Sequence, residues 1–118
     1  MKRQTLQETK LKIVSDPKHQ MVYIMDFVDD FRKAKDPALA EDFIPEDTPL
    51  DALLASIVEA LCLELNLEPP DVVFNVPPLK SPYFVSGIES LKAITIVESP
   101  VTFKRRNIFV LKNFLVRV

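Results

Sequence analysis

The residues with the clearest chemical potential in this sequence are Lys104, Arg105, Arg106 and Asn107. Arg side chains are suited to gripping a carboxylate or phosphate through two parallel hydrogen bonds. Because three adjacent bases cannot share one helical face, we expect at least one of the two arginines to point inward and to bind carbonyls or acids of segment 36–79. Contact with an acidic partner protein and contact with nucleic-acid phosphate are the alternatives.

Tyr83 and Phe84 form the second candidate, an aromatic pair that follows a proline in a predicted loop. Such a pair either plugs the core or anchors an interface. The candidate binding residues are therefore Lys104, Arg105, Arg106, Asn107, Tyr83 and Phe84.

No combination of residue types indicates catalysis. The sequence has one Cys, Cys62, and one His, His19, which is too few for a zinc site and offers no positioned base for a nucleophile. The acidic run 41–47 lacks the spacing of a calcium loop, and a single Gly cannot build a glycine-rich phosphate loop. We therefore predict no catalytic residues, no metal site and no cofactor, and lean against an enzyme.

Cys62 and the hydropathy pattern indicate the cellular compartment in which we expect the protein. A single cysteine builds no disulfide framework, and we expect a buried, inert thiol in a reducing cytosol. The sequence has no uncharged apolar run of membrane-spanning length, and its first residues, MKRQTLQETKLK, lack the apolar core of a signal peptide. We expect a cytoplasmic protein that is neither secreted nor membrane-spanning.

Charge is strongly segregated along the chain, although the formal net charge is only −2. Residues 1–35 carry eight Lys or Arg against five Asp or Glu, residues 36–79 carry ten acids and no base, and residues 80–118 carry seven bases against two acids. A near-neutral total argues against general nucleic-acid binding. We expect the acidic middle to pair with the basic C-terminal region inside the fold; a local basic patch is the alternative.

The elements that must position these residues are organised around the apolar stretch 48–66. Thr48 is a suitable N-cap, Pro49 suits the first helical position, and Asp51 completes a capping box. Leucines and other apolar residues recur at steps of three and four and extend well beyond one stripe. The pattern predicts a central helix that other elements cover on most sides.

The segments before this helix predict one further helix and a proline-broken link. Residues 17–34 begin with Pro17 and carry an apolar stripe at helical spacing: Met21, Ile24, Met25, Val28 and Phe31. Residues 1–14 are expected to be a frayed terminus or a short, weakly held helix. Prolines break the link between the two helices, although residues 38–43 have room for a single helical turn.

The segments after the central helix mix helix and strand signals. Residues 71–76 have strand-like composition between prolines, and we interpret them as an extended segment over the helices with room for a short strand. Ser86 can cap a helix over 88–97, but the β-branched residues there suit a buried helix or a strand equally. Asn107 suits a left-handed turn before a last short helix. The residues expected in the C-terminal core are Phe103, Phe109, Leu111, Phe114 and Leu115.

Three pieces of the sequence resemble a family of small bacterial proteins that is found in actinobacteria among others. They are DPKHQMVYIMDFVDDFRKAKDPALA, LDALLASIVEALCLELNLEPP and SPYFVSGIESLKAITIVESPVTFKRRNIFVLKNFL, which cover about residues 16–115. The most specific part is ESP, Phe103 and RRNIFV; members are usually richer in Gly and often have Trp where Tyr83 stands. The resemblance implies no activity, but occasional proximity to genes of nucleotidyltransferase-like toxins implies an antitoxin or accessory role.

These observations predict an all-α fold: a compact bundle of four to five helices around the central helix, with proline-rich extended connections, in a single domain over 1–118. We expect a small cytosolic bacterial protein that acts through contact with a partner protein or a second copy, and expect neither nucleic acid nor membrane as a partner. The alternatives are a small-ligand- or phosphate-binding protein or enzyme with a site near the basic C-terminal segment, and an antitoxin-like or DNA-associated accessory protein. A deep polar pocket beside Arg105 and Arg106 would favour a ligand, and a solid surface the contact role.

Overall fold

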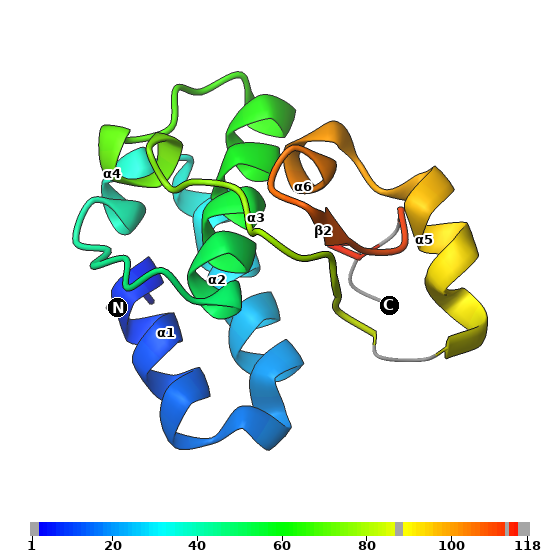
Figure 1. Ribbon diagram of the computed structural model, residues 1–118. Helices are drawn as coiled ribbons and strands as arrows, with labels where there is room; N and C mark the ends of the chain where they lie inside the picture. Colours follow the sequence, from blue (N-terminus) through cyan, green and yellow to red (C-terminus); the bar gives the residue numbers. More distant parts are fainter. Residues whose placement is uncertain (1–2, 87–88, 113, 116–118) are drawn as a thin grey trace.

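The helix Pro49–Leu65 (α3) lies at the centre of the computed structural model, which describes residues 3–86, 89–112 and 114–115 (Figure 1). The Thr48 hydroxyl accepts a hydrogen bond from the N–H of Asp51, and the Asp51 carboxylate accepts one from the N–H of Thr48. Asn66 ends the helix in a left-handed conformation with φ 59°. Because α3 contacts α1, α2, α4 and α6, the prediction of a central, well-covered helix is confirmed.

A helical hairpin covers one side of α3. It consists of Leu6–Ser15 (α1) and Gln20–Ala34 (α2), joined by the 3-10 turn Pro17–His19. Of the two alternatives for residues 1–14 the structure has the helix, which begins at its own capping box and buries four side chains. The expected stripe of α2 is buried except at Met21, which is 40% exposed; Phe27 is fully buried in addition.

The connections around α3 contain two short helical turns. The 3-10 turn Pro37–Ala40 confirms the single turn expected near 38–43. Residues Asp71–Phe74 (α4) form one α-helical turn, so the extended interpretation of 71–76 was wrong. Pro70 stands extended at the N-cap, and its carbonyl accepts from the N–H of Phe74. Val73 is the only side chain that this helical turn buries. The backbone geometry after the extended Pro70 therefore outweighs the β-propensity of the side chains.

The chain then crosses α3 and builds the C-terminal region, which lies on the other side of α3 from α1 (Figure 1). Tyr83–Phe84 (β1) and Ile108–Phe109 (β2) pair in parallel, with Tyr83 opposite Ile108. Tyr83 and Phe84 therefore lie in a strand, not in the loop that the sequence indicated. Asn107 has the expected left-handed backbone, with φ 66°, but β2 follows it where we expected a helix.

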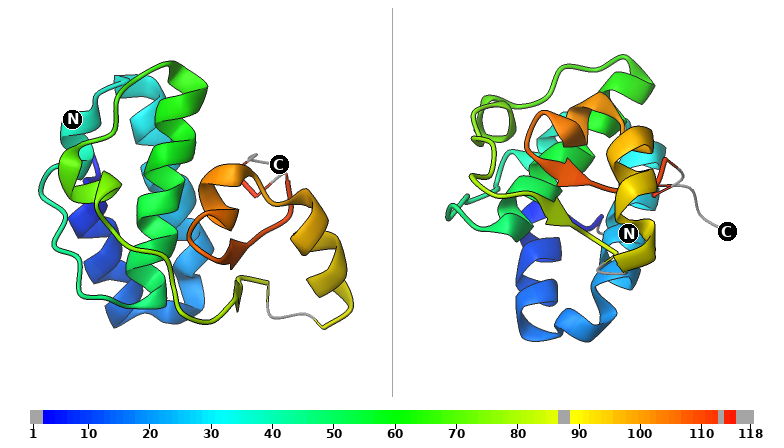
Figure 2. Two further views of the ribbon diagram at one scale, coloured as in Figure 1. Left: turned by 45° about the horizontal axis from the view of Figure 1, so that its top comes forward. Right: turned by 45° about the vertical axis from the view of Figure 1, so that its right-hand side comes forward.

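Helix α5 (Lys92–Glu98) follows the 3-10 turn Glu89–Leu91 and leads into the single turn Val101–Lys104 (α6). The helix alternative for residues 88–97 is correct over α5, while Ile88 lies outside the described residues. The expectation of a buried helix was wrong, because Thr95 is the only buried residue of α5. Both views in Figure 2 place α5 at the outer edge of the molecule.

The described residues form a mostly helical, compact structure with a radius of gyration of 13.3 Å, which confirms the all-α prediction. Of the expected C-terminal core residues Phe103 is fully buried, and the other four are half-buried. None of the helices described here is long and apolar enough to span a membrane.

Candidate functional site

Arg106 is the arginine that points inward, and it is 2% exposed. Its Nε donates to the carbonyl of Val76 at 3.0 Å, and its Nη2 donates to the carbonyls of Val73 at 3.0 Å and Phe74 at 3.3 Å. Nη2 also forms an ion pair with Glu59 on α3. All these acceptors belong to segment 36–79. The expectation that one arginine binds carbonyls and acids of the acidic middle is therefore confirmed.

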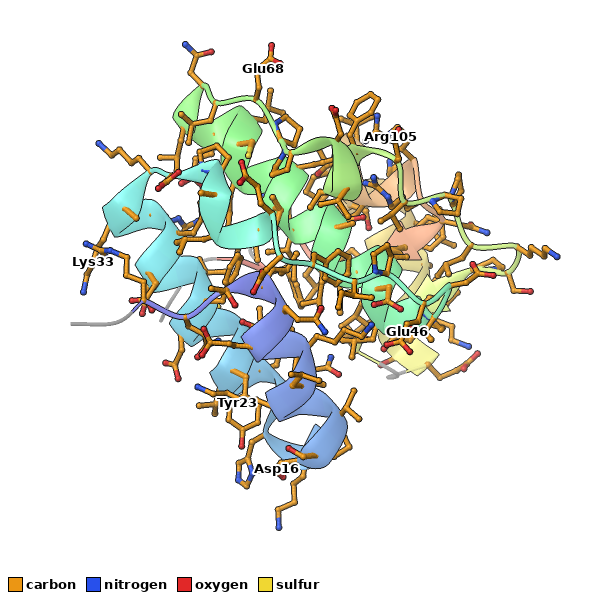
Figure 3. The ribbon with its side chains drawn as sticks, turned by 90° about the vertical axis from the view of Figure 1, so that its left-hand side faces the viewer. Asp16, Tyr23, Lys33, Glu46, Glu68 and Arg105 are labelled. Carbon is orange, nitrogen blue, oxygen red and sulfur yellow. The ribbon has the colours of Figure 1, made fainter. Side chains whose placement is uncertain are left out.

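Arg105 lies at the surface beside the same acid. Its side chain is 47% exposed and its Nη2 forms an ion pair with the second carboxylate oxygen of Glu59. The guanidinium carbon lies 5.7 Å from the ring centroid of Phe74, which is 56% exposed. Figure 3 shows Arg105 near the outside of the molecule. Because one carboxylate serves two guanidinium groups, one positive charge is left over at this place.

A small pocket of about 170 Å³ adjoins the two arginines. Phe74, Val76 and Pro78 form its apolar walls, and Arg105 and Arg106 complete the lining. Burial lowers the pKa of Arg106 to about 10, so the side chain stays charged at neutral pH. Its Nη1 atom is buried and has no hydrogen-bond partner among the described residues. The pocket is smaller than the sites that usually hold drug-sized ligands, so it is not the deep cleft that would favour such a ligand.

Lys104 and Asn107, which flank the two arginines in the sequence, make different contacts from the arginines. Lys104 is exposed, and its Nζ lies 3.3 Å from the carbonyl oxygen of Val97 at the end of α5. Asn107 donates from its side-chain amide to the carbonyl of Leu79 at 3.2 Å, which ties the turn to the proline-rich connection. Arg117, which accompanies them in sequence, lies outside the described residues.

Tyr83 and Phe84 belong to the small sheet and do not line the pocket beside Arg105. Tyr83 packs against the core, as expected for a plug. Phe84 stacks on Phe109 with ring centroids 5.2 Å apart, and the Nζ of Lys92 lies 5.2 Å from the Phe84 ring. The structure thus brings Arg105 and Arg106 together and places the aromatic pair elsewhere.

A second hollow, which we call the α3–α6 groove, has a volume of about 300 Å³ and was not predicted. Leu63 of α3 and Val101 of α6 line it and are 71% and 69% exposed. Phe103 and Phe114 add aromatic lining. The only sequence signal for this groove was that the apolar character of α3 extends around the helix as far as Leu63.

Charged residues also line the α3–α6 groove. Arg32 donates from Nε and Nη2 to the two carboxylate oxygens of Glu64, each at 2.9 Å, and from Nη1 to the carbonyl of Leu115. The hydrogen bonds that Arg32 donates to Glu64 raise the pKa of Arg32 despite its partial burial. This pair is electrically neutral. Lys112, which is exposed and makes no ion pair within the described part of the chain, leaves the groove with a positive charge.

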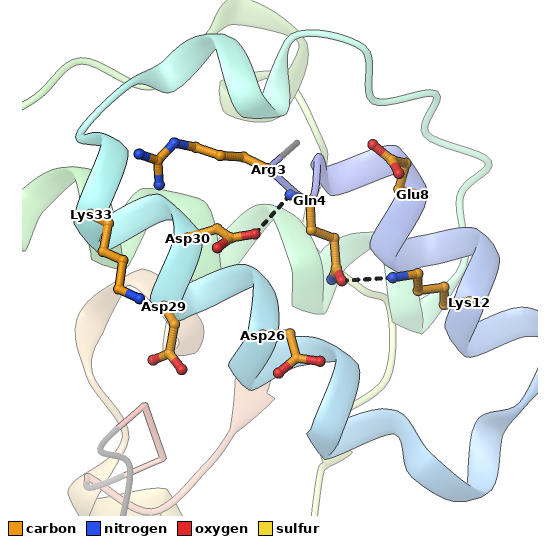
Figure 4. Close-up of a pocket in the computed structure, with 8 residues that line it drawn as sticks. All are labelled: Arg3, Gln4, Glu8, Lys12, Asp26, Asp29, Asp30 and Lys33. Atoms are coloured by element: carbon orange, nitrogen blue, oxygen red, sulfur yellow. Dashed lines mark hydrogen bonds between the residues drawn. The ribbon is translucent and has the colours of Figure 1, made fainter. Parts of the chain in front are cut away.

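A third hollow of about 360 Å³ lies between the N-terminal segment and α2 (Figure 4). Asp30 accepts from the N–H of Gln4 at 2.8 Å, and Lys12 donates to the Gln4 side chain at 2.9 Å. Its lining contains four acids and three bases, so it has no strong preference for a charged ligand of either sign. No group of His, Cys, Asp or Glu within the described ranges could hold a metal ion.

Cys62 has the buried environment that the sequence predicted, and His19 lies at the surface. Cys62 is 1% exposed, and burial raises the pKa of its thiol to about 11. His19 is exposed, and its Nδ1 lies 2.8 Å from a carboxylate oxygen of Asp16 that also accepts from the hydroxyl of Tyr23. Those hydrogen bonds, the one from Tyr23 first, lower the pKa of Asp16. Asp16 and Tyr23 lie together at the turn between α1 and α2 (Figure 3).

Comparisons with protein-family models, with curated proteins and with solved structures found no match to this chain. The resemblance to small bacterial proteins therefore stays a prediction.

Proposed function

We propose that this protein works by binding another protein, and that the α3–α6 groove and the adjoining face of α5 receive an acidic amphipathic helix of that partner. The single observation that carries the proposal is the apolar surface left uncovered at this end of the molecule. It comprises four side chains that are each 47% to 76% exposed: Leu63, Ile94, Val97 and Val101, of which Ile94 and Val97 are three residues apart and share one face of α5.

Helix α5 is a poor helix in isolation. It has seven residues, and four of them in succession, 94–97, are β-branched, a residue class with reduced helix propensity. Helices this short are marginal in water unless tertiary packing holds them. Only Thr95 is buried, and Ile94, Ile96 and Val97 are 47%, 48% and 76% exposed, so about half or more of each of these three apolar side chains is left uncovered by the described chain. A partner that covered this face would supply the missing packing.

A short connection joins the end of α5 to α6, which lines the groove. Val97 at the end of α5 is 76% exposed, and Val101, the first residue of α6, lines the groove. Contiguous exposed apolar surface beside a groove marks interaction sites in monomeric proteins. An amphipathic helix is the element that commonly lays an apolar stripe into such a groove.

The charges around this surface favour an acidic partner. Lys112 lines the groove, and Lys104 lies over the end of α5. The pairing of Arg32 with Glu64 cancels the charge of the acid that also lines the groove. Carboxylates along the flank of a docked helix would therefore meet unneutralised cations, which raises the rate and specificity of association. The buried thiol of Cys62 suits a reducing compartment, and we retain the bacterial cytoplasm as the proposed setting.

The experiment compares Leu63→Asp and Val101→Asp with Ile44→Asp. All three side chains are more than 60% exposed, but Ile44 lies outside the groove, so its variant controls for an added surface charge. Proteins captured from the native host by the wild type are identified, purified and titrated by calorimetry. We expect at least tenfold weaker binding for both groove variants and unchanged binding for Ile44→Asp. Equal binding by all four proteins would refute the proposal.

Lys112→Glu tests the charge requirement separately. Because it reverses a charge that faces the groove, we expect weaker binding and a smaller salt dependence than the wild type has. A partner segment without excess Asp and Glu, or binding that improves in this variant, would contradict the acidic-helix assignment.

A further inference from the structure

We propose that the pocket beside Arg105 is a second, independent binding site, and that it binds the carboxylate of a small apolar organic acid. Arg105 holds the carboxylate, and Phe74, Val76 and Pro78 cover the apolar part of the ligand. The site does not share a lining residue with the α3–α6 groove, so it does not depend on the proposed protein contact.

The first argument is charge. Arg105 and Arg106 both contact Glu59, and no other carboxylate pairs with either of them among the described residues. With Glu59 ionised, the cluster carries one uncompensated positive charge, and Arg106 is almost completely removed from water. A monoanion that binds at Arg105 restores neutrality to a cluster whose inner member, Arg106, is shielded from water.

The second argument is hydrogen bonding. Arg105 uses Nη2 for Glu59, and no described hydrogen bond uses its Nε or Nη1. A guanidinium can present two parallel N–H groups to a carboxylate. Arg106, which lines the same pocket, also has a buried Nη1 without a partner in the described chain. Buried donors without a partner are rare in folded proteins and call for an explanation.

The third argument is the shape and polarity of the walls. The three residues other than arginine that line the pocket are apolar, and the Phe74 ring lies under the Arg105 guanidinium. A phosphate dianion would exceed the single uncompensated charge and would place its remaining oxygens against apolar walls. A short aliphatic chain ending in a carboxylate matches both the charge and the walls within about 170 Å³.

The experiment titrates the full-length protein with sodium butyrate, acetate, phosphate and chloride at equal ionic strength and pH 7. Two-dimensional NMR follows the Nε–H signal of Arg105 and the ring signals of Phe74. We expect saturable shifts of both residues with butyrate, at least fivefold weaker binding of acetate, and small linear shifts with phosphate and chloride. Butyrate shifts that match those of chloride, or saturation by phosphate in place of butyrate, would overturn the proposal.

Variants separate this site from general attraction of anions. Arg105→Gln should abolish saturation by butyrate, and Phe74→Ala should weaken it at least threefold; both side chains are about half exposed, so both variants are expected to fold. Lys18→Gln removes one exposed charge at the distant α1–α2 turn and should leave binding unchanged. Leu63→Asp should also leave butyrate binding unchanged, which makes failure here distinguishable from failure of the groove. Saturable binding of butyrate by Arg105→Gln would refute the assignment of Arg105 as the residue that holds the carboxylate.

Discussion

Glu59 on α3 and Arg106, in the turn that follows α6, form an ion pair inside the core, where the two side chains are 7% and 2% exposed. The pair joins the acidic middle of the chain to its basic C-terminal region. Because Arg106 also donates to three carbonyls around α4, one side chain connects α3, α4 and α6. We therefore regard Arg106 as a structural residue, and Arg105 as the member of the motif that is available to a ligand.

Arg106→Met should destabilise the protein by about 3–5 kcal/mol, because it leaves the buried Glu59 carboxylate with only the half-exposed Arg105 as a partner and removes the donors of three carbonyls. Arg105→Met, which removes the half-exposed partner of the same acid, should cost no more than about 1 kcal/mol. Urea unfolding followed by circular dichroism measures both. Equal losses for the two variants would show that the burial of Arg106 does not increase its contribution to the free energy of unfolding.

Acid should weaken the contact between Lys10 of α1 and Asp51 of α3, whose Nζ and Oδ1 atoms lie 2.9 Å apart. Burial opposes ionisation of Asp51, but hydrogen bonds from Thr48, Lys10 and the N–H of Glu46 keep its pKa below the ordinary 3.8. A lowered folded-state pKa means that this carboxylate stabilises the fold above its unfolded pKa and stops doing so as pH falls through the folded value.

We therefore expect the free energy of unfolding to decline below about pH 4. Asp51→Asn should cost about 3–5 kcal/mol at pH 7 and progressively less toward pH 2, because the wild type loses the same interaction there. Asp47→Asn changes an exposed acid next to the capping box and serves as the control. A pH-independent difference between wild type and Asp51→Asn would contradict the assignment.

Cys62 should resist alkylation in the folded protein. Its thiol is buried and has a pKa raised to about 11, so both access and thiolate formation are suppressed at pH 8. We expect labelling by iodoacetamide, followed by mass spectrometry, to be at least ~100-fold slower than in urea. Arg106→Met should label faster in proportion to its lost stability. Rapid labelling of the wild type would show that the thiol is accessible.

Asn107 should be replaceable by Gly at lower cost than by Ala. Its φ of 66° disfavours a residue with a Cβ, so Asn107→Ala should lose about 1–2 kcal/mol from the backbone conformation in addition to the hydrogen bond to Leu79. Asn107→Gly loses only the hydrogen bond, about 1 kcal/mol. Urea unfolding ranks the two variants. Equal losses would mean that the side-chain amide, not the backbone conformation, determines the requirement for Asn.

Local signals predicted the elements that are stabilised by residues close in sequence. The capping box of Thr48 and Asp51 starts α3, as the sequence predicted, because it acts through hydrogen bonds within one turn. The same reasoning placed the left-handed turn at Asn107. It failed for residues 71–76, where side-chain composition indicated an extended segment and the backbone after Pro70 made a helical turn.

The sequence by itself determined the central helix, the helix over residues 17–34 before it, and the inward direction of one of two adjacent arginines. Periodicity and the geometry of neighbouring side chains suffice for these. Only the tertiary structure decided that the buried arginine is Arg106, that Tyr83 pairs with Ile108 in a parallel strand, and that α5 stays uncovered. Those outcomes depend on which segments far apart in the sequence pack together. The neighbours of a residue in the chain do not determine which distant segment it contacts in the folded protein.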